Sequence, residues 1–218
     1  MKKNERGILR KVLENSYAYK LFQKLIRPNV PAGSVMRRYI PQMGKGKRIL
    51  DLGCGTAEIL KFLHGEESYV GIDYNDNYIA GAAKEYQNRK TARFISADLN
   101  AYASTCTEKF DIVLMIGVLH HIDDQAIEMT MKSIRRILDP NGEFISLDCC
   151  YSKQMNPIAR LIVSLDRGRH VRHEDEMTSL MNRYWKNVWY EKRTDTLKLP
   201  YNVIAFKCSG IKESFDDV

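Results

Sequence analysis

Short apolar runs alternate with amphipathic stretches along most of the chain. Ile49, Leu50 and Leu52 form a run that ends at a glycine-rich turn, which is typical of a buried parallel strand. Beyond the turn, Ile59 and Leu63 mark an apolar stripe at helical spacing, and another short run follows. The alternation predicts strand and helix in turn, and therefore a parallel α/β sheet with right-handed crossovers.

The same pattern sets the bounds of the expected elements. We expect further strands at residues 69–72, 92–96, 110–117 and 143–148, helices at residues 76–87 and from Asp123–Asp124 to Leu138, a turn at 140–142, and two strands at 186–196 and 201–208 joined near Leu199–Pro200. Thr56 is the expected N-cap of the helix after the glycine turn.

The glycine turn indicates the kind of ligand. It reads Asp51-Leu52-Gly53-Cys54-Gly55-Thr56-Ala57, followed by Glu58 where dinucleotide binders have their third glycine. Two carboxylates beside the turn would repel a pyrophosphate but suit a ligand with a ribose and a cationic body. Asp73 follows the next strand, 22 residues after Asp51, at the place of an acid that binds ribose hydroxyls.

This arrangement resembles the class I methyltransferases that use S-adenosylmethionine (SAM), whose first motif is an acid followed by x-G-x-G-x-G, here with Ala57 in place of the last glycine. The resemblance implies a doubly wound, Rossmann-like, seven-stranded sheet, mostly parallel with an antiparallel last strand. It implies a methyltransferase domain over residues 47–210, an N-terminal helical lid over 1–46, an acceptor-site insertion at 149–185 and a tail at 211–218. Its cofactor would be SAM.

The resemblance also assigns cofactor-binding residues at the carboxyl ends of the first four strands. The expected set is Asp51, Gly53, Cys54, Gly55, Asp73, Tyr74, Asp98, Leu99, Ile116 and Gly117. Asp51 is expected near the methionine amino group and Asp98 near the adenine amine, with a helix cap as the less favoured role of Asp98.

The segment after the central strand is the candidate catalytic loop. It carries Leu119-His120-His121, which resembles the small-molecule branch of the family, and lacks the D/N-P-P-Y/F/W motif of nucleic-acid amino methyltransferases. A hydroxyl acceptor needs a general base, and His120, His121 and His170 are the candidates, with His121 slightly preferred to His120 and Asp148 held in reserve. A neutral amine needs none, so oxygen and nitrogen acceptors both stay open.

A cluster of arginines marks the expected acceptor pocket. Arg160, Arg167, Arg169 and Arg172 lie within thirteen residues, with Gly168 as a place where the chain could bend. Such a cluster is either a solvated surface or a fork-like grip on a carboxylate or phosphate. The expected acceptor-binding residues are Arg167, Arg169, Arg172, Asp148 and Tyr201.

Charge and composition limit the remaining alternatives. The 218 residues carry a net charge of +7, and residues 1–48 hold 13 basic side chains against two acidic ones. That N-terminal stretch reads as amphipathic helices ending near Pro28, with a shorter helix at 34–39. This basic stretch could contact an anionic membrane. The alternative functions are a nucleic-acid or protein methyltransferase that uses this surface, and a catalytically silent protein that binds SAM.

Cysteine usage and hydropathy indicate the compartment. Five cysteines without a C-x-x-C pair, and no secretory signal or membrane span, favour a reduced, cytoplasmic monomer or homodimer without a metal.

Overall fold

A computed structural model describes residues 46–65, 67–164, 168–194 and 201–213. Its elements in chain order are β1 Arg48–Leu52, the 3₁₀ helix η1 Glu58–Phe62, β2 Ser68–Asp73, α4 Asp76–Glu85, β3 Ala92–Ser96, α5 Leu99–Thr105, β4 Phe110–Ile116, α6 Asp124–Ile137, β5 Leu138–Cys149, α7 Pro157–Ser164, α8 Glu174–Tyr184, β6 Trp185–Arg193 and β7 Val203–Ile211. The predicted N-terminal helices, Arg167 and the turn at Leu199–Pro200 lie outside the described residues.

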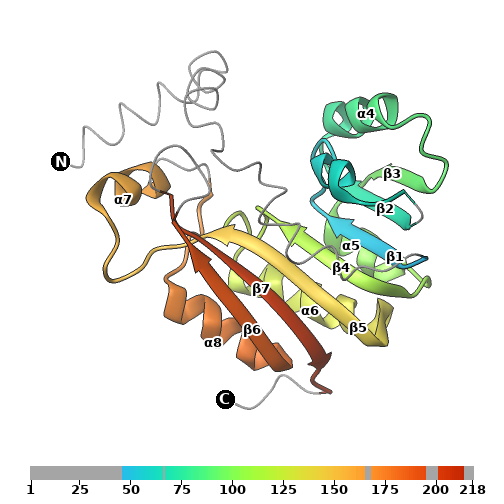
Figure 1. The fold of residues 1–218 in the computed structure, drawn as a ribbon. Helices are drawn as coiled ribbons and strands as arrows, with labels where there is room; N and C mark the ends of the chain where they lie inside the picture. The colour runs from blue at the N-terminus through green and yellow to red at the C-terminus, as the bar shows by residue number, and fades with distance from the viewer. Residues whose placement is uncertain (1–45, 66, 165–167, 195–200, 214–218) are drawn as a thin grey trace.

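Seven strands form one sheet in the order β3-β2-β1-β4-β5-β7-β6 (Figure 1). The first five are parallel, and β7 runs antiparallel to both β5 and β6. The predicted fold class, including the antiparallel last strand, is confirmed. Because the chain moves outward from β1 in one direction and from β4 in the other, the carboxyl ends of β1 and β4 flank the crevice where such sheets bind ligands.

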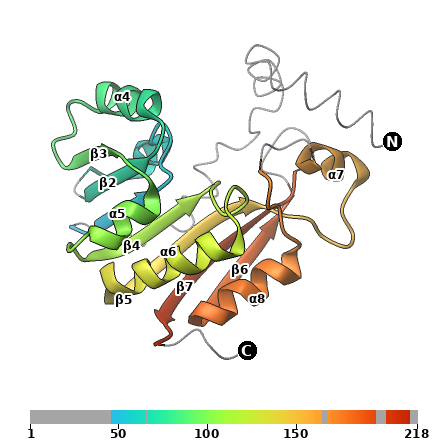
Figure 2. The same ribbon diagram turned by 180° about the vertical axis from the view of Figure 1, so that it is seen from behind.

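Each face of the sheet has its own apolar core. On one face, α5, α6 and α8 cover the strands (Figure 2), and Met131 and Met181 belong to the same buried cluster as Leu50 and Phe144. On the other face, Leu60 of η1 and Ala82 of α4 pack with residues of β1, β2 and β4. The strands between these layers are buried on both sides, which explains their continuous apolar sequences.

The glycine turn is followed by a shorter helix than the sequence predicts. Only one 3₁₀ turn forms, its N-cap is Ala57, and the side chain of Thr56 is exposed. The prediction that Thr56 caps an α-helix is therefore wrong. Ala57 adopts a left-handed conformation (φ 55°, ψ 37°) immediately before the 3₁₀ turn begins.

Strand β5 begins earlier than predicted. Its first residue, Leu138, pairs with Phe110, and the next pair of the ladder joins Glu143 to Ile112. The expected turn at 140–142 is thus an irregularity within β5. A Cβ on Gly142 would lie 2.7 Å from the Leu138 side chain, so this fold of the chain onto itself requires glycine.

Three helices escaped prediction, namely α5, α7 and α8. The sequence signal for α8 was readable, because Met177, Met181 and Tyr184 are buried at positions i, i+4 and i+7. A capping box starts α8, in which Glu176 accepts a hydrogen bond from the His173 N–H (2.7 Å). Among the described helices, none is long and apolar enough to span a membrane.

A buried glutamate fixes the connection between η1 and β2. Glu67 is fully buried, and its carboxylate accepts hydrogen bonds from the N–H groups of His64 (3.1 Å) and Gly65 (2.8 Å) and from the Arg89 guanidinium (3.2 Å). Burial alone would raise the pKa of Glu67, but these donors outweigh it and hold the pKa below its usual value of 4.5.

We expect Glu67→Ala to lower the free energy of unfolding by about 2–4 kcal/mol, since it leaves three donors without their acceptor. Because the folded-state pKa is lowered, the stabilisation is complete above pH 4.5 and is lost as the pH falls through the folded value. Urea unfolding at pH 7 and pH 4 measures both effects. Glu128→Ala, which removes a surface carboxylate paired with Lys132, is the control and should change stability little. An equal loss in both variants would contradict the role of Glu67.

Candidate functional site

Carboxylates gather at the carboxyl edge of the parallel strands. Asp51 lies in β1, Asp73 ends β2, Asp98 follows β3 and Asp148 is the penultimate residue of β5. Parallel strands bring these ends together, so residues far apart in sequence meet at one edge. Each carboxylate has a different set of partners, and the partners distinguish their roles.

The glycine turn between β1 and η1 is tied to the end of β2. The N–H groups of Gly53 and Cys54 donate to the Ile72 carbonyl (2.8 and 2.9 Å), and the Gly55 N–H donates to Asp73 Oδ2 (2.9 Å). Gly53 and Gly55 both have positive φ (80° and 54°). A Cβ on Gly53 would lie 2.5 Å from Val118, so this residue must be glycine to let the turn approach the loop after β4.

Ala57 occupies the position of the family's last glycine. Its left-handed conformation is one that glycine adopts freely and that costs other residues roughly 1–2 kcal/mol. The departure from the motif therefore changes the residue but keeps the backbone conformation.

Asp73 has the geometry of a ribose-binding acid. Its Oδ2 accepts from Gly55 and its Oδ1 accepts from the Asn75 N–H (2.9 Å), so the turn and the start of α4 hold the carboxylate rigidly. Each oxygen has a second lone pair that can accept from a hydroxyl. Tyr74, the next residue, is 82% exposed.

Asp51 is a buried carboxyl with an incomplete set of partners. Tyr69 donates its hydroxyl to Oδ2 (2.6 Å), whereas Oδ1 is buried and has no hydrogen-bond partner among the residues that the structure describes. Burial raises the pKa of Asp51 to about 7, against the lowering effect of the Tyr69 hydrogen bond and with a smaller contribution from Asp73. An unsatisfied buried carboxylate oxygen suits a cationic group, and this fits the ammonium of SAM. Tyr69 was not predicted, since its apolar neighbours in β2 mark it as a core residue.

Cys54 faces the same buried corner. Its thiol lies within 3.6 Å of the Gly55 carbonyl oxygen, and a Cβ on Gly71 would lie 2.9 Å from Sγ. Burial raises the pKa of Cys54, and the Asp51 and Asp73 carboxylates raise it further. The side chain is therefore a neutral thiol at physiological pH and not a nucleophile.

The expected adenine-side residues lie after β3 and β4. Asp98 is exposed and caps α5, because its Oδ1 accepts from the N–H groups of Asn100 (3.0 Å) and Ala101 (2.9 Å). Leu99 begins α5 and packs on the core, as does Ile116 at the end of β4. Gly117 follows with a φ of 68°. Any contact between these residues and a cofactor stays a prediction.

A histidine and an aspartate are paired after the central strands. His120 Nδ1 lies 2.5 Å from Asp148 Oδ1, and the Leu119 and His120 N–H groups donate to the same carboxylate (3.3 and 3.2 Å). Asp148 is 2% exposed and His120 is 8% exposed. The described contacts of Asp148 are thus with the loop that carries His120, and its predicted role in binding an acceptor stays a prediction.

The other two candidate histidines lie beside this pair. The exposed ring of His121 is tilted against that of His120 with the ring centroids 4.0 Å apart. The His170 N–H donates to the His120 carbonyl (3.0 Å). The three histidines are therefore neighbours in the fold, and Asp148 contacts the ring of His120. Which of them serves as a base stays a prediction.

Arg172, a predicted acceptor-binding residue, has its guanidinium bonded within the protein. Its Nε and one N–H of Nη2 donate to Asp124, while its other N–H groups donate to backbone carbonyls. The acceptors are the carbonyls of Leu119 (2.8 Å), His170 (3.1 Å) and Ile122 (3.0 Å). All five donors of the guanidinium are used, and none is left for an acceptor molecule.

The segment 168–172 packs against the His120 loop. A Cβ on Gly168 would lie 2.2 Å from His120 Cδ2 and 2.6 Å from its carbonyl oxygen. The lack of a side chain at Gly168 therefore lets this segment lie directly against His120. Arg169 is exposed beside it, and Arg160 lies over the Tyr151 ring (5.7 Å). Tyr201 is half-buried next to β7, where its N–H approaches the Thr194 carbonyl (3.5 Å).

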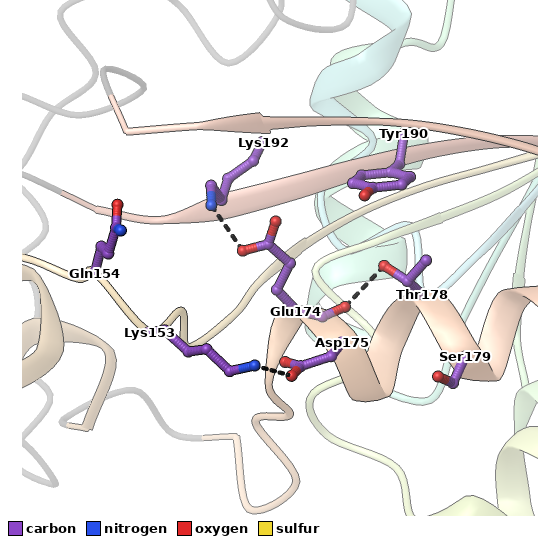
Figure 3. A pocket seen from close by; sticks show the side chains of 8 residues that line it. All are labelled: Lys153, Gln154, Glu174, Asp175, Thr178, Ser179, Tyr190 and Lys192. Atoms are coloured by element: carbon purple, nitrogen blue, oxygen red, sulfur yellow. Dashed lines mark hydrogen bonds and ion pairs between the residues drawn. The ribbon is translucent and has the colours of Figure 1, made fainter.

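A hollow of about 470 Å³ lies between α8 and β6, away from the glycine turn (Figure 3). Its charged side chains neutralise one another, because Lys192 pairs with Glu174 (2.7 Å) and Lys153 pairs with Asp175 (3.2 Å). Within the described ranges, no group of three or more histidine, cysteine or acidic side chains could hold a metal ion.

The chain is similar to known methyltransferases in sequence. A family model described as "Methyltransferase domain" matches residues 43–204. The human "Probable tRNA methyltransferase 9B" is 29% identical over 111 residues, which are 50% of this chain and 23% of that protein. The "Ubiquinone biosynthesis O-methyltransferase" of Thiobacillus denitrificans is 27% identical over 99 residues, which are 44% of this chain and 42% of that protein. The chain thus spans less than half of either relative.

A solved structure shows the same fold. The N-methyltransferase NodS from Bradyrhizobium japonicum, in complex with S-adenosyl-L-homocysteine, has a TM-score of 0.65 at 14% identity and covers 97% of this chain and 100% of its own. With the family model matching most of the chain, the conclusion is direct: the chain belongs to the methyltransferase-domain family, and it shares the fold of NodS.

Proposed function

We infer that this enzyme methylates an oxygen or nitrogen atom of a small, anionic molecule. The observation that carries the proposal is Arg169, which is exposed on the segment that packs over His120. A guanidinium at this place can grip a carboxylate or phosphate through two parallel hydrogen bonds and orient the acceptor.

The acidic residues support the cofactor half of this proposal. SAM supplies a methyl group that is already activated on a sulfonium. Asp73 would accept from its ribose hydroxyls, and Asp51 would take its ammonium group. The remaining predicted contacts would come from Gly53, Cys54, Gly55, Tyr74, Asp98, Leu99, Ile116 and Gly117. Because SAM is a cation and would be bound by these acidic residues, the arginines of the cluster would serve the acceptor and not the cofactor.

Arg169 differs from the other described arginines of its cluster. All N–H groups of the Arg172 guanidinium donate hydrogen bonds within the protein, and the Arg160 guanidinium lies over the Tyr151 ring. Arg169 is the member of the described cluster whose guanidinium has no protein partner. Alignment of the acceptor with the methyl group contributes much of the rate in such a displacement, so a rigid grip would serve catalysis as well as binding.

A nucleic-acid acceptor is the second candidate. The surplus of basic residues in 1–48 supports it, and so does the similarity to the human protein named as a probable tRNA methyltransferase. Against it, the sequence lacks the amino-methyltransferase motif after β4.

We expect Asp73→Ala to weaken SAM binding more than tenfold, because charge-assisted hydrogen bonds worth about 1.5–3 kcal/mol are lost. Isothermal titration calorimetry measures the affinity, and circular dichroism checks that the variant is folded. Asp175→Ala removes an exposed carboxylate of α8 and should bind SAM as the wild type does. Wild-type affinity in a folded Asp73→Ala protein would reject the assignment.

We expect SAM affinity to rise with pH up to about 7 and then to level off, since the cation requires the carboxylate form of Asp51. The raised pKa means that below pH 7 a proton must leave before the cation binds, so affinity falls by up to about tenfold per pH unit. Asp51→Asn should bind more weakly at pH 8 and lose this pH dependence, while keeping an acceptor for the Tyr69 hydroxyl. Calorimetry from pH 5 to pH 8 tests this, and an Asn variant with the wild-type slope would contradict it.

We expect radiolabelled methyl groups from SAM to appear in an anionic metabolite fraction of a cell extract, and not in its RNA or protein. Once the acceptor is purified, Arg169→Lys should raise its KM about tenfold or more, because an ammonium cannot reproduce the fork of the guanidinium.

Arg93→Lys is the matched control, since Arg93 pairs with Glu108 at the far edge of the sheet. It should leave KM unchanged. Label in tRNA would favour the second candidate, and an Arg169→Lys protein with wild-type KM would remove Arg169 from the site.

A further inference from the structure

Tyr69 brings a hydroxyl into the buried corner of Asp51, and this contact carries an inference about the cofactor. We propose that Tyr69 is a positioning residue for cofactor binding, because its hydroxyl fixes one oxygen of the Asp51 carboxylate and leaves the other for the ammonium group of SAM. The inference rests on the role given to Asp51 in the proposed function, and it adds a residue that lies outside the glycine motif.

The register of β1 and β2 brings the Tyr69 ring toward Asp51. Tyr69 pairs with Ile49 and Gly71 pairs with Asp51, so the tyrosine is the diagonal neighbour of the aspartate on one face of the sheet. A Cβ on Gly71 would lie 3.0 Å from Tyr69 Cε1. The lack of a side chain at Gly71 therefore lets the buried ring extend past it to the carboxylate.

The hydrogen bond from Tyr69 determines which oxygen of Asp51 remains available. Tyr69 donates to Oδ2 at 2.6 Å, and Oδ1 has no partner among the described residues. A carboxylate can turn about its bond to Cβ and exchange its two oxygens, whereas a short bond from a ring packed in the core holds one orientation. Because Asp51 is buried, Oδ1 stays unsatisfied until a ligand supplies a donor, and a cation is the donor that suits a carboxylate best.

The titratable groups around Asp51 are Tyr69 from β2, Asp73 at the end of β2 and Cys54 in the glycine turn, while its neighbour in β4 is the apolar Leu114. Burial raises the pKa of Tyr69 well above its usual 10 and also raises the pKa of Cys54, so both side chains are neutral. Burial raises the pKa of Asp51 too, and the charge of Asp73 adds to this effect. Among these groups, Tyr69 is the one whose contact favours the carboxylate form of Asp51.

Tyr86 provides a matched comparison for Tyr69. Both rings contact Phe94, with centroid distances of 6.0 Å for Tyr69 and 6.2 Å for Tyr86. The Tyr86 hydroxyl is also buried, but it has no hydrogen-bond partner within the described part of the chain. Phenylalanine at either position keeps the ring and removes one hydroxyl, so a difference between the two variants reports the bond to Asp51.

The first test measures the Asp51 carboxylate without a ligand. In NMR titrations of the full chain, labelled with ¹³C at the aspartate carboxyl groups, Tyr69→Phe should raise the pKa of Asp51 by roughly 1 unit, because the donor that favours the charged form is lost. Tyr86→Phe should leave this pKa unchanged, and Asp51→Asn assigns the signal by removing it. An Asp51 pKa that is the same in Tyr69→Phe as in the wild type would overturn the proposal.

The second test separates the ammonium group from the rest of the cofactor. S-adenosylhomocysteine carries this group, whereas 5′-methylthioadenosine has the same nucleoside without the amino acid. Calorimetry from pH 5 to pH 9 should show that Tyr69→Phe weakens S-adenosylhomocysteine binding about fivefold at pH 7 and moves the pH at which affinity levels off from about 7 to about 8. The affinity for 5′-methylthioadenosine should stay the same. Equal weakening of both ligands, or no change in either, would overturn the proposal.

A double-mutant cycle with Asp51→Asn completes the design. Asparagine has no charge for the ammonium group, so adding Tyr69→Phe to Asp51→Asn should change S-adenosylhomocysteine affinity by about twofold at most. A fivefold loss in that background as well would show that Tyr69 acts through packing, and would overturn the proposal.

The same variants distinguish a failure of this inference from a failure of the proposed function. A Tyr69→Phe protein that binds both ligands as Tyr86→Phe does would overturn this inference alone. An Asp51→Asn protein with the affinity and pH slope of the wild type would remove Asp51 from the cofactor site, and would overturn this inference through the proposed function. None of these measurements uses a methyl acceptor, so their outcome does not depend on the acceptor half of the proposed function.

Discussion

The parallel strands bring several carboxylates to one edge of the sheet, and the surrounding residues must stabilise these negative charges. Carboxylates that lose water need donors or cations in its place. Asp73 takes backbone N–H groups of the glycine turn and of the start of α4. Asp98 takes the first N–H groups of α5, and Asp148 takes the loop that carries His120. Asp51 receives a single hydroxyl and keeps one oxygen without a partner.

The number of hydrogen-bond donors around each carboxylate separates the acids with a structural role from Asp51, whose second oxygen could still bind a ligand. Three of the carboxylates shape the backbone around the crevice, since each one joins two segments or starts a helix. Asp51 contributes little to that architecture, and its burial has an electrostatic cost that a cation would remove. The partly unsatisfied carboxylate thus lies on the β1–β2 side of this edge, while the contacts among His120, Asp148 and Arg172 lie on the side of β4 and β5.

Local sequence determines the first half of the fold well and the second half poorly. The strands up to β4 were predictable because each is a short apolar run, and β3 was predicted with its observed bounds at residues 92–96. Asp73 was predicted as a ligand-binding acid because it ends a strand 22 residues after Asp51, downstream of the glycine turn. The contacts among His120, Asp148, Gly168 and Arg172 were not predictable, since they join residues 28 to 53 positions apart and depend on how β5 and α7 return the chain. The left-handed conformation of Ala57 was not predictable either, because the glycine turn is held by hydrogen bonds to the Ile72 carbonyl in β2, which is distant in the sequence.

The segment 168–172 is held to the catalytic loop through its main chain and through one arginine. His170 donates its backbone N–H, Gly168 contributes the absence of a side chain, and Arg172 reaches backbone carbonyls. The side chains at positions 169 and 171 take no part in these bonds. Substitutions there would leave the backbone contacts of the histidine loop in place, so under the proposed function the acceptor could change without disturbing that loop. Such a division would let one framework serve relatives with very different acceptors.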